Sequence, residues 1–414
     1  MNYYIKNIHI NHLFHLQDVN IPISSEIAPH LMLTGKNGSG KTVLLNAIAS
    51  FLDIIKDDVR LNFTTYRQSL EYFESQLNNG LSDAQALRQA QMNAKYFREQ
   101  TDALFGKVEL DFIDVTSLIK DYQAGNFIIA FYQAARKSEM IEPKNPTKPE
   151  FATKGNVRNV VSNQFLHFLS DLKIQEALAR NEQQLQDADL IAQWFTDFEE
   201  MLRSIYQDKQ LQLKFNYKDY SFQIHTGNKA FKFTETSDGF AAILDIVADL
   251  ILKMQASNNL VRAYQKKGIV LIDEVETHLH LELQRIIMPI LTKIFPNIQF
   301  IITTHSPFVL NSLDNAVAFD LEHRKVIDEL TQYSYEALTE GYFGVSSESS
   351  YTEMQLDTLE NLLKKGPLSE ADKSTIRHLM TDLDKVPESV SPNIVGSYLS
   401  LKIKYASVIN AVLQ

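Results

Sequence analysis

The sequence contains no cysteine among its 414 residues. Disulfide bonds, thiolate metal sites and cysteine nucleophiles are therefore excluded. Long hydrophobic runs are also missing: the longest apolar stretches, such as residues 269–272, are strand-sized and far shorter than the ~18 residues of a membrane-spanning helix. The first residues lack the basic-then-apolar pattern of a signal peptide. We therefore expect a cytoplasmic protein without a membrane partner.

Positive charge is in short supply, because 40 Lys and Arg face 51 Asp and Glu, giving a net charge of -11. A uniformly basic surface for nucleic acid is thereby excluded, whereas a local basic groove is not. Hydrophobic residues make up 44% of the chain and charged residues 22%, which is typical of a globular protein. The length corresponds to two or three domains of about 100–200 residues each.

A glycine-rich segment matches the P-loop pattern G-x-x-x-x-G-K-[ST] in full. Residues 31–33 before it predict a buried strand and residues 43–52 after it predict a helix, which is the context that a P-loop requires. Backbone N–H groups of such a loop, and the N-terminus of the helix, bind phosphate oxygens. The predicted nucleotide-binding residues are Gly35, Lys36, Asn37, Gly38, Ser39, Gly40, Lys41 and Thr42.

Two side chains of this loop have further predicted roles. Lys41 would reach the β- and γ-phosphates and is counted among the catalytic residues, and Thr42 would give its hydroxyl oxygen to Mg²⁺. The sequence therefore predicts ATP and Mg²⁺ as cofactors.

Polar residues follow two further buried strands. Asp273 and Glu274 end the strand at 268–272, and ligands bind at the carboxyl edge of open α/β sheets. We expect Asp273 to hold Mg²⁺ and Glu274 to act as the general base for the attacking water. His305 follows the strand at 298–302 and would contact the γ-phosphate. The alternatives are a solvated acidic turn for the carboxylates and a capping histidine in a loop.

A second predicted anion site lies at the start of an apolar helix over 241–254, where Ser237, Asp238 and Gly239 precede it. A serine and a glycine at a helix N-terminus favour anion binding. Since one chain then carries two anion sites, the second is expected to serve the nucleotide of a partner chain. The alternative is a helix cap followed by a tight turn.

The remaining pattern predicts further elements. Residues 3–23 predict two strands joined by a turn near Asn11, and Ser82 is a predicted helix N-cap. Further strands are expected at 107–115, 126–133, 211–215, 220–225, 230–233, 317–320 and 325–328, and helices at 63–103, 159–207, 281–294, 356–365 and 369–383.

Taken in order, these motifs resemble the ATPase head of the ABC superfamily, in the branch shared by SMC-like repair ATPases, RecF and OLD-type ATPases. The resemblance covers roughly residues 1–325. It implies an α/β ABC-type P-loop NTPase fold with an inserted helical subdomain and a small helical C-terminal tail. The implied parts are residues 1–135 and 231–330 for the ATPase domain, 136–230 for a loop and the helical insertion, and 331–414 for the tail.

The same resemblance assigns roles to motif residues. Thr236 to Phe240 correspond to the ABC signature, with Thr236 in place of the usual leucine; 276–280 correspond to the D-loop and His305 to the H-switch. Gln133 is the candidate for the Q-loop glutamine that ligates Mg²⁺ and contacts nucleotide, and Gln68 is its rival. His278 and His280 are interpreted as dimer contacts rather than as a zinc pair, because no third ligand has suitable spacing.

Two features of related ATPases, long coiled coils and a Toprim nuclease domain, are not indicated by this sequence. No sustained heptads separate Lys41 from Ser237, and the Asp382-x-Asp384 pair ends a predicted helix rather than a strand, unlike a Toprim nuclease. The signature leading directly into its apolar helix, and the helical tail after residues 335–338, resemble the stand-alone ATPases of bacterial anti-phage systems such as Septu, retrons and PARIS. The resemblance implies a homodimer or higher homo-oligomer and a separate effector, such as an HNH or Toprim-like nuclease.

Two other functions stay open. A RecF-like DNA-binding repair ATPase would need a basic surface, for which nucleic acid is a second candidate partner. Such a surface is offered by the loop at 136–158, with Arg136, Lys137, Lys144, Lys148, Lys154 and Arg158 against three glutamates. The other alternative is an assembly scaffold with slow ATP turnover.

Overall fold

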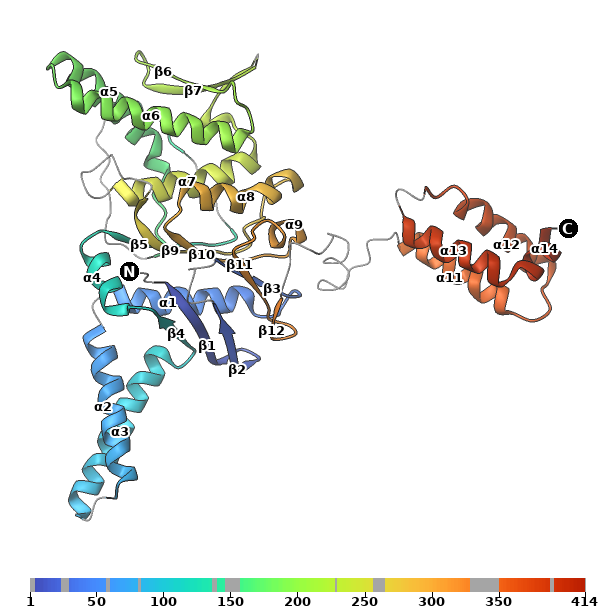
Figure 1. Ribbon diagram of the computed structural model, residues 1–414, viewed down its shortest axis with the longest axis horizontal. Helices are drawn as coiled ribbons and strands as arrows, with labels where there is room; N and C mark the ends of the chain where they lie inside the picture. The colour runs from blue at the N-terminus through green and yellow to red at the C-terminus, as the bar shows by residue number, and fades with distance from the viewer. Residues whose placement is uncertain are drawn as a thin grey trace. The chain divides into compact units, whose positions relative to one another are not determined.

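The computed structural model describes residues 4–23, 30–56, 60–80, 83–135, 140–145, 157–227, 229–255, 265–327, 350–387 and 391–413. The chain divides into two compact units, Met1–Tyr333 and Ser334–Gln414. Figure 1 labels the helices and strands of both.

A central sheet carries the first unit. Its six strands lie in the order β12 (Lys325–Ile327), β11 (Ala316–Asp320), β3 (His30–Thr34), β10 (Ile298–Thr303), β9 (Lys267–Ile272) and β5 (Phe127–Tyr132). All neighbouring pairs are parallel except β11 with β12. Strands β3, β10 and β5 are buried at every residue, as expected when both faces of a parallel sheet are covered.

Helices cover both faces of this sheet (Figure 1). Helix α1 (Lys41–Lys56) lies on one face, and α7 (Asp238–Gln255) and α8 (Leu281–Ile294) lie on the other. Because β3, β9, β10, β5 and β11 are parallel, their carboxyl ends meet at one edge of the sheet. That edge carries the predicted P-loop, the acidic pair and the histidine.

A second, antiparallel sheet orders β2 (Leu16–Pro22), β1 (Ile5–Leu13) and β4 (Val108–Phe112). The buried side chain of Gln299 on β10 ties it to the central sheet. Its Oε1 accepts from the Ile5 backbone N–H at 2.9 Å and its Nε2 donates to the Ile5 carbonyl at 3.0 Å. The side-chain amide thus satisfies the backbone N–H and carbonyl groups of Ile5 at the start of β1.

Three local predictions were wrong or fall elsewhere. The turn between the first two strands lies at Phe14, whose φ is +57°, and not near Asn11, because the apolar pattern continues through Leu13. The strand predicted at 107–115 ends at Phe112, since Asp114 accepts from the Ser117 N–H at 2.9 Å and starts helix α4 (Val115–Gln123). Ser82 lies outside the described residues, and the N-cap of the helix that follows is Asp83, which accepts from the Gln85 and Ala86 N–H groups.

Two helical parts extend the first unit (Figure 1). An arm consists of α2 (Arg60–Asn78) and α3 (Ala84–Phe105), and α3 is capped by Asp83. An insertion consists of η1 (Ser162–Gln164), α5 (Phe165–Asn181), α6 (Leu185–Tyr206) and the small antiparallel sheet of β6 (Gln212–Asn216), β7 (Ser221–Thr226) and β8 (Lys229–Lys232). The rings of Phe168, Trp194 and Phe198 pack together in its core.

Short elements complete this unit at η2 (Phe233–Glu235) and α9 (Pro307–Leu310). The second unit consists of α11 (Ser350–Lys364), α12 (Glu370–Leu383), α13 (Pro392–Lys404) and α14 (Ala406–Leu413) in its described part, around a core of its own. The predicted capping box of Ser369 and Asp372 at the start of α12 is confirmed.

A buried histidine occupies the start of the P-loop strand. The Nδ1 atom of His30 accepts from the Phe300 backbone N–H at 3.1 Å, and its ring packs on the Phe300 ring at 5.5 Å between centroids. Burial lowers the pKa of His30 to about 4. The folded protein therefore keeps this imidazole neutral.

This neutral histidine makes the free energy of unfolding depend on pH. Below about pH 6.5 the unfolded chain binds a proton at His30 that the folded chain refuses, so stability falls as pH falls, by up to ~1.4 kcal/mol per pH unit until about pH 4. The His30→Asn variant keeps an acceptor for Phe300 but does not titrate. We expect it to be less stable than wild type at pH 7.5, with a gap that narrows towards pH 4.5.

Fluorescence of Trp194, the single tryptophan, would report the unfolding of this unit in denaturant at each pH. Exposed His12→Asn is the matched control and should follow the wild-type curve. A wild-type-to-His30→Asn gap that stays constant from pH 7.5 to 4.5 would contradict the assignment.

Candidate functional site

The glycine-rich loop joins β3 to α1 at the carboxyl edge of the sheet. Gly35, Gly38 and Gly40 have φ angles of +132°, +85° and +96°, a region that residues with a Cβ rarely adopt. At Gly35 a Cβ would also come within 3.2 Å of the Glu322 backbone nitrogen. The loop conformation therefore requires these glycines, as a phosphate cradle does.

Lys41 is buried at the start of α1. Its Nζ donates to the Gly35 carbonyl at 2.7 Å and to the Lys36 carbonyl at 3.0 Å. Burial lowers the pKa of Lys41, and nearby carboxylates, led by Glu274, oppose that shift. The ammonium group is thus held inside the loop, where phosphate oxygens could replace the carbonyls as its acceptors.

Asp273, directly after β9, connects the start of helix α1 to the end of β10 through hydrogen bonds to one carboxylate oxygen. Its Oδ1 accepts from Thr42 Oγ1 at 3.1 Å and from Thr303 Oγ1 at 2.6 Å. Thr303 Oγ1 in turn accepts from the Glu274 backbone N–H at 2.7 Å. A hydroxyl and a carboxylate that meet in this way supply the hard oxygen ligands that Mg²⁺ prefers, so the residues fit the metal.

Glu274 lies next to this cluster in a strained backbone conformation. Its φ is +45°, which is uncommon for a residue other than glycine, asparagine or aspartate. The Oε2 atom accepts from Thr277 Oγ1 at 3.4 Å. Strain of this kind is concentrated at functional sites, and it agrees with the catalytic role predicted for Glu274.

His305 follows β10, the strand between the P-loop strand and the Asp273 strand. Burial lowers the pKa of His305 and the charge of Lys41 lowers it further, against the opposing effects of Glu274 and Asp273. The imidazole is therefore neutral at pH 7. The charges of Asp273 and Glu274 act on the pKa of both Lys41 and His305, so these four residues, predicted from separate segments, lie close together.

Glu276 is a residue whose role the sequence did not reveal. Its Oε1 accepts from the His305 backbone N–H at 2.6 Å, and burial raises its pKa. Ser306 Oγ donates to Gln284 Oε1 at 2.7 Å, and Gln284 Nε2 donates to the Leu279 carbonyl at 2.8 Å. Hydrogen bonds from Glu276 and Gln284 thus connect the chain after β9 to residues 305 and 306, which follow β10.

The two candidate glutamines lie in different surroundings. Gln133 is exposed directly after β5, and the preceding Tyr132 carbonyl accepts from the Asp273 backbone N–H at 2.8 Å. Gln68 is exposed within the arm helix α2, and its neighbour Arg67 pairs with Glu109 of the antiparallel sheet rather than with the central sheet. The geometry favours Gln133 as the glutamine beside the metal-binding edge.

The predicted signature begins helix α7, on the sheet face opposite to α1 (Figure 1). Ser237 and Asp238 are exposed and Gly239 is buried. A Cβ on Gly239 would approach Leu283 Cδ1 at 3.0 Å and the His278 carbonyl at 3.2 Å. Gly239 of the predicted signature therefore packs against the predicted D-loop segment of its own chain.

His278 and His280 are both exposed. Among the residues that the structure describes, no group of three or more His, Asp or Glu side chains is arranged to hold a metal ion. Their interpretation as dimer contacts stays a prediction.

Further residues border the P-loop that no motif indicated. His15 Cε1 lies 3.8 Å from where a Gly40 Cβ would be, and the exposed Phe14 ring contacts the His15 ring edge-on at 5.0 Å. On the other side of the loop, Glu322 pairs with Lys36 at 3.4 Å. The buried Asp320 contributes to the field at Lys41. Such contacts arise only from tertiary packing.

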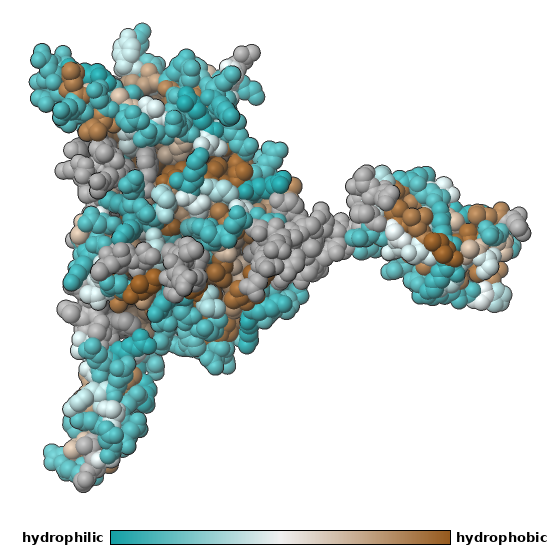
Figure 2. Space-filling model, viewed as in Figure 1, coloured by the Kyte–Doolittle hydropathy of each residue, from teal (hydrophilic) through white to brown (hydrophobic). Residues whose placement is uncertain are grey.

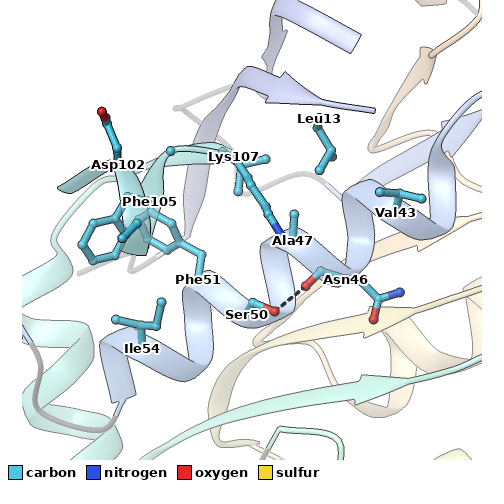
Figure 3. Close-up of a pocket in the computed structure, with 13 residues that line it drawn as sticks. Leu13, Val43, Asn46, Ala47, Ser50, Phe51, Ile54, Asp102, Phe105 and Lys107 are labelled. Atoms are coloured by element: carbon cyan, nitrogen blue, oxygen red, sulfur yellow. Dashed lines mark hydrogen bonds between the residues drawn. The ribbon is translucent and has the colours of Figure 1, made fainter. Parts of the chain in front are cut away.

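A pocket of about 330 Å³ lies along the outer surface of α1 (Figure 3). Its walls are mainly apolar, and the Lys107 side chain extends over it towards Ala47 and Asn46 (Figure 3). Val43, one residue after Thr42, belongs to its lining, and so does Leu13 of the antiparallel sheet. The pocket therefore reaches the first turn of α1, although Thr42 itself does not line it.

Asp249 links the signature helix to two other parts of the unit. This fully buried carboxylate accepts from the Tyr132 hydroxyl at 2.6 Å and from the Val161 backbone N–H at 2.6 Å. Lys253, one turn later on α7, also donates to it. Helix α7, the strand end before Gln133 and the start of the helical insertion thus share one carboxylate.

Fold and site together define an α/β P-loop ATPase with a helical insertion and a helical C-terminal unit, as the motifs predicted. The chain belongs to the family described as "AAA domain, putative AbiEii toxin, Type IV TA system", whose model matches residues 31–311. None of the described helices combines the length and hydrophobicity needed to cross a membrane.

Curated relatives narrow the family. The chain is 25% identical to the "Septu protein PtuA" of Bacillus mycoides (strain KBAB4) over 395 residues, which are 92% of this chain and 50% of that protein. It is 41% identical to the "Retron Ec83 probable ATPase" of Escherichia coli over 93 residues, 22% of this chain and 17% of that protein. The chain thus spans half or less of the length of these relatives. The predicted similarity to Septu and retron ATPases is confirmed.

Among solved structures, an SMC head bound to the C-terminal winged-helix domain of ScpA aligns with a TM-score of 0.37 at 13% identity, over 78% of this chain and 97% of that chain. A score this low carries no argument about function.

The buried ammonium of Lys41 gives the first test of the site. We expect Lys41→Ala to lower ATP affinity by at least ~100-fold, about 2.7 kcal/mol, because the cradle loses its internal cation. Calorimetric titration with ATP would measure this. Lys95→Ala on the arm, which removes an exposed lysine, is the control; ATP affinity equal in the two variants would refute the P-loop assignment.

Proposed function

We propose that the protein hydrolyses ATP in a composite site formed by two copies of the chain, and that this cycle controls a separate effector in anti-phage defence. The observation that supports it best is the convergence of Lys41, Asp273, Glu274 and His305 at one sheet edge. The Septu and retron relatives support the defence setting.

Within one chain, the P-loop would hold the phosphates of ATP. Thr42 and Asp273, with Gln133 beside them, would hold Mg²⁺, which neutralises charge on the β- and γ-phosphate oxygens. Glu274 would accept a proton from the attacking water. His305, neutral because of burial and of Lys41, would contact the γ-phosphate.

The adenosine part would lie along α1 towards the pocket of Figure 3. That pocket begins at Val43 and its mainly apolar walls suit a purine ring, while Lys107 and Asn46 offer polar groups. The rings of Phe14 and His15 border the same loop.

The second half of the site would come from another copy. Ser237 and Asp238 are exposed at the N-terminus of α7, which favours anion binding. Because α7 covers the sheet face opposite to α1 (Figure 1), we infer that this end serves the nucleotide of a partner chain. Hydrolysis would then loosen the pair, since each nucleotide state has a different affinity for the closed dimer.

One of the basic residues that a RecF-like DNA-binding surface would need is already paired within the protein. Arg158 pairs with Asp53 at 3.3 Å and donates to Asn46 Oδ1 at 3.2 Å on helix α1. It therefore holds the insertion on the P-loop helix rather than offering a free charge. Lys144 is exposed, and the other four basic residues of that loop lie outside the described residues.

The shared site predicts the behaviour of Glu274→Gln. Loss of the general base should reduce ATP turnover by about 100-fold or more while ATP still binds, so the ATP-bound dimer accumulates. Light scattering during chromatography with saturating ATP would measure the oligomer, and phosphate release would measure turnover.

The exposed Glu282→Gln on α8 is the matched control and should keep wild-type turnover. A Glu274→Gln protein that binds ATP but stays monomeric would eliminate the shared site. Wild-type turnover in Glu274→Gln would eliminate the assigned base.

A further inference from the structure

We propose that the outer face of the β6–β8 sheet binds the phosphate backbone of a nucleic-acid strand with unpaired bases. This surface belongs to the helical insertion and lies outside the nucleotide site. It was not among the basic segments considered from the sequence.

Charge is distributed unevenly within the insertion. Residues 165–206 carry eight acidic and three basic residues, whereas residues 208–232 carry two aspartates and five lysines: Lys209, Lys214, Lys218, Lys229 and Lys232. A local excess of lysine stands out in a chain of net charge -11, and local charge decides the binding of a polyanion.

These lysines differ in their pairing from the basic residues of the neighbouring helices. The three basic residues of helices α5 and α6, Lys173, Arg180 and Arg203, form ion pairs with acidic residues of the same helices. By contrast, no ion pair joins any of the five sheet lysines to a described residue. Three acids lie near the sheet. Asp208 and Asp219 accept from the backbone N–H groups of Gln210 and Ser221, and Asp219 also interacts electrostatically with Lys232. Glu235 accepts from the Lys232 backbone N–H at 2.9 Å.

The strand register aligns two of the lysines on one face. Gln223 of β7 pairs with Lys214 of β6 on one side and with Lys232 of β8 on the other. Side chains opposite each other across a sheet share a face, so the row reads Lys-Gln-Lys with its ends about 9.5 Å apart. An amide between two ammonium groups offers a continuous row of hydrogen-bond donors to phosphate oxygens.

The opposite face of this sheet packs against helix α6 in the core of the insertion. Phe222 and Ile224 are buried, and the Phe222 ring stacks on Phe195 of α6 at 6.0 Å between centroids. The lysine row therefore faces outward. Figure 2 shows mainly hydrophilic residues over this part of the molecule.

An exposed aromatic residue favours unpaired bases over duplex. Tyr217 stands beside Lys218 in the β6–β7 turn, and 74% of its surface is exposed. Aromatic side chains next to a basic track stack on the bases of single strands, and an exposed ring has no comparable partner in an intact duplex.

The test uses the full chain and fluorescein-labelled 20-nucleotide oligo(dT) and oligo(U), with a 20-base-pair duplex for comparison, by fluorescence anisotropy between 50 and 300 mM salt. We expect the single strands to bind more tightly than the duplex. In the Lys214→Gln/Lys232→Gln variant, affinity should fall and the slope of log K against log salt should become shallower by about 1.4 for two lost phosphate contacts. Tyr217→Ala should weaken single-strand binding roughly tenfold.

The control variant Lys364→Gln/Lys365→Gln removes the same charge from ion pairs in the second unit and should bind like wild type. No binding at 50 mM salt, or equal losses in the two double variants, would overturn the proposal. A duplex preference that is unaffected by Tyr217→Ala would also overturn it. Unchanged Trp194 fluorescence in the sheet variants would show that the insertion still folds. Titration of the same variants with ATP would test the nucleotide site independently of the sheet.

Discussion

The geometry of the site depends on one carboxylate. Asp273 accepts from Thr42 at the end of the P-loop and from Thr303 at the end of β10, and it ends β9 itself. The ends of β9 and β10 and the start of helix α1 are thereby held together at one edge of the sheet. Replacing this carboxylate would leave the hydroxyl groups of Thr42 and Thr303 without their acceptor. It would also remove one of the negative charges that counter the lowering of the Lys41 pKa by burial.

A second buried carboxylate relates the catalytic edge to the rest of the unit. Asp249 joins the signature helix, the strand before Gln133 and the first residues of the insertion. Arg158 adds a connection from the insertion to the P-loop helix. The insertion therefore contacts the helices on both faces of the sheet through hydrogen bonds and an ion pair. A displacement of α7 would also move or break the hydrogen bond from Tyr132 to Asp249.

Much of this could be predicted from sequence, because the relevant signals are local. The P-loop needs a fixed spacing of glycines and a lysine, and Asp273 and His305 follow continuous apolar runs whose strand character is unambiguous. Glu276 lies in the predicted D-loop segment, but its contact with His305 could not be found in this way. Nor could the positions of Asp320 and His15, since these depend on strands that are adjacent in space but distant in the chain. The turn at Phe14 was missed because a positive φ at a phenylalanine contradicts its usual preference. The lysine row was missed because only strand register brings Lys214 and Lys232 together.

The short connection after β8 has a thermodynamic consequence. Glu235 accepts from the Lys232 backbone N–H at 2.9 Å, so the last strand of the basic sheet is joined through one turn of 3₁₀ helix to the signature. Only five positions separate Lys232 from Ser237. If a nucleic-acid strand bound on the sheet shifted this turn, it would alter the affinity that we propose for the predicted signature and a nucleotide. Linkage would then require ATP to alter the affinity of the sheet for nucleic acid by the same factor. Nucleic-acid binding at the sheet and ATP binding at the predicted signature would then be described by one coupling free energy, measurable from either side.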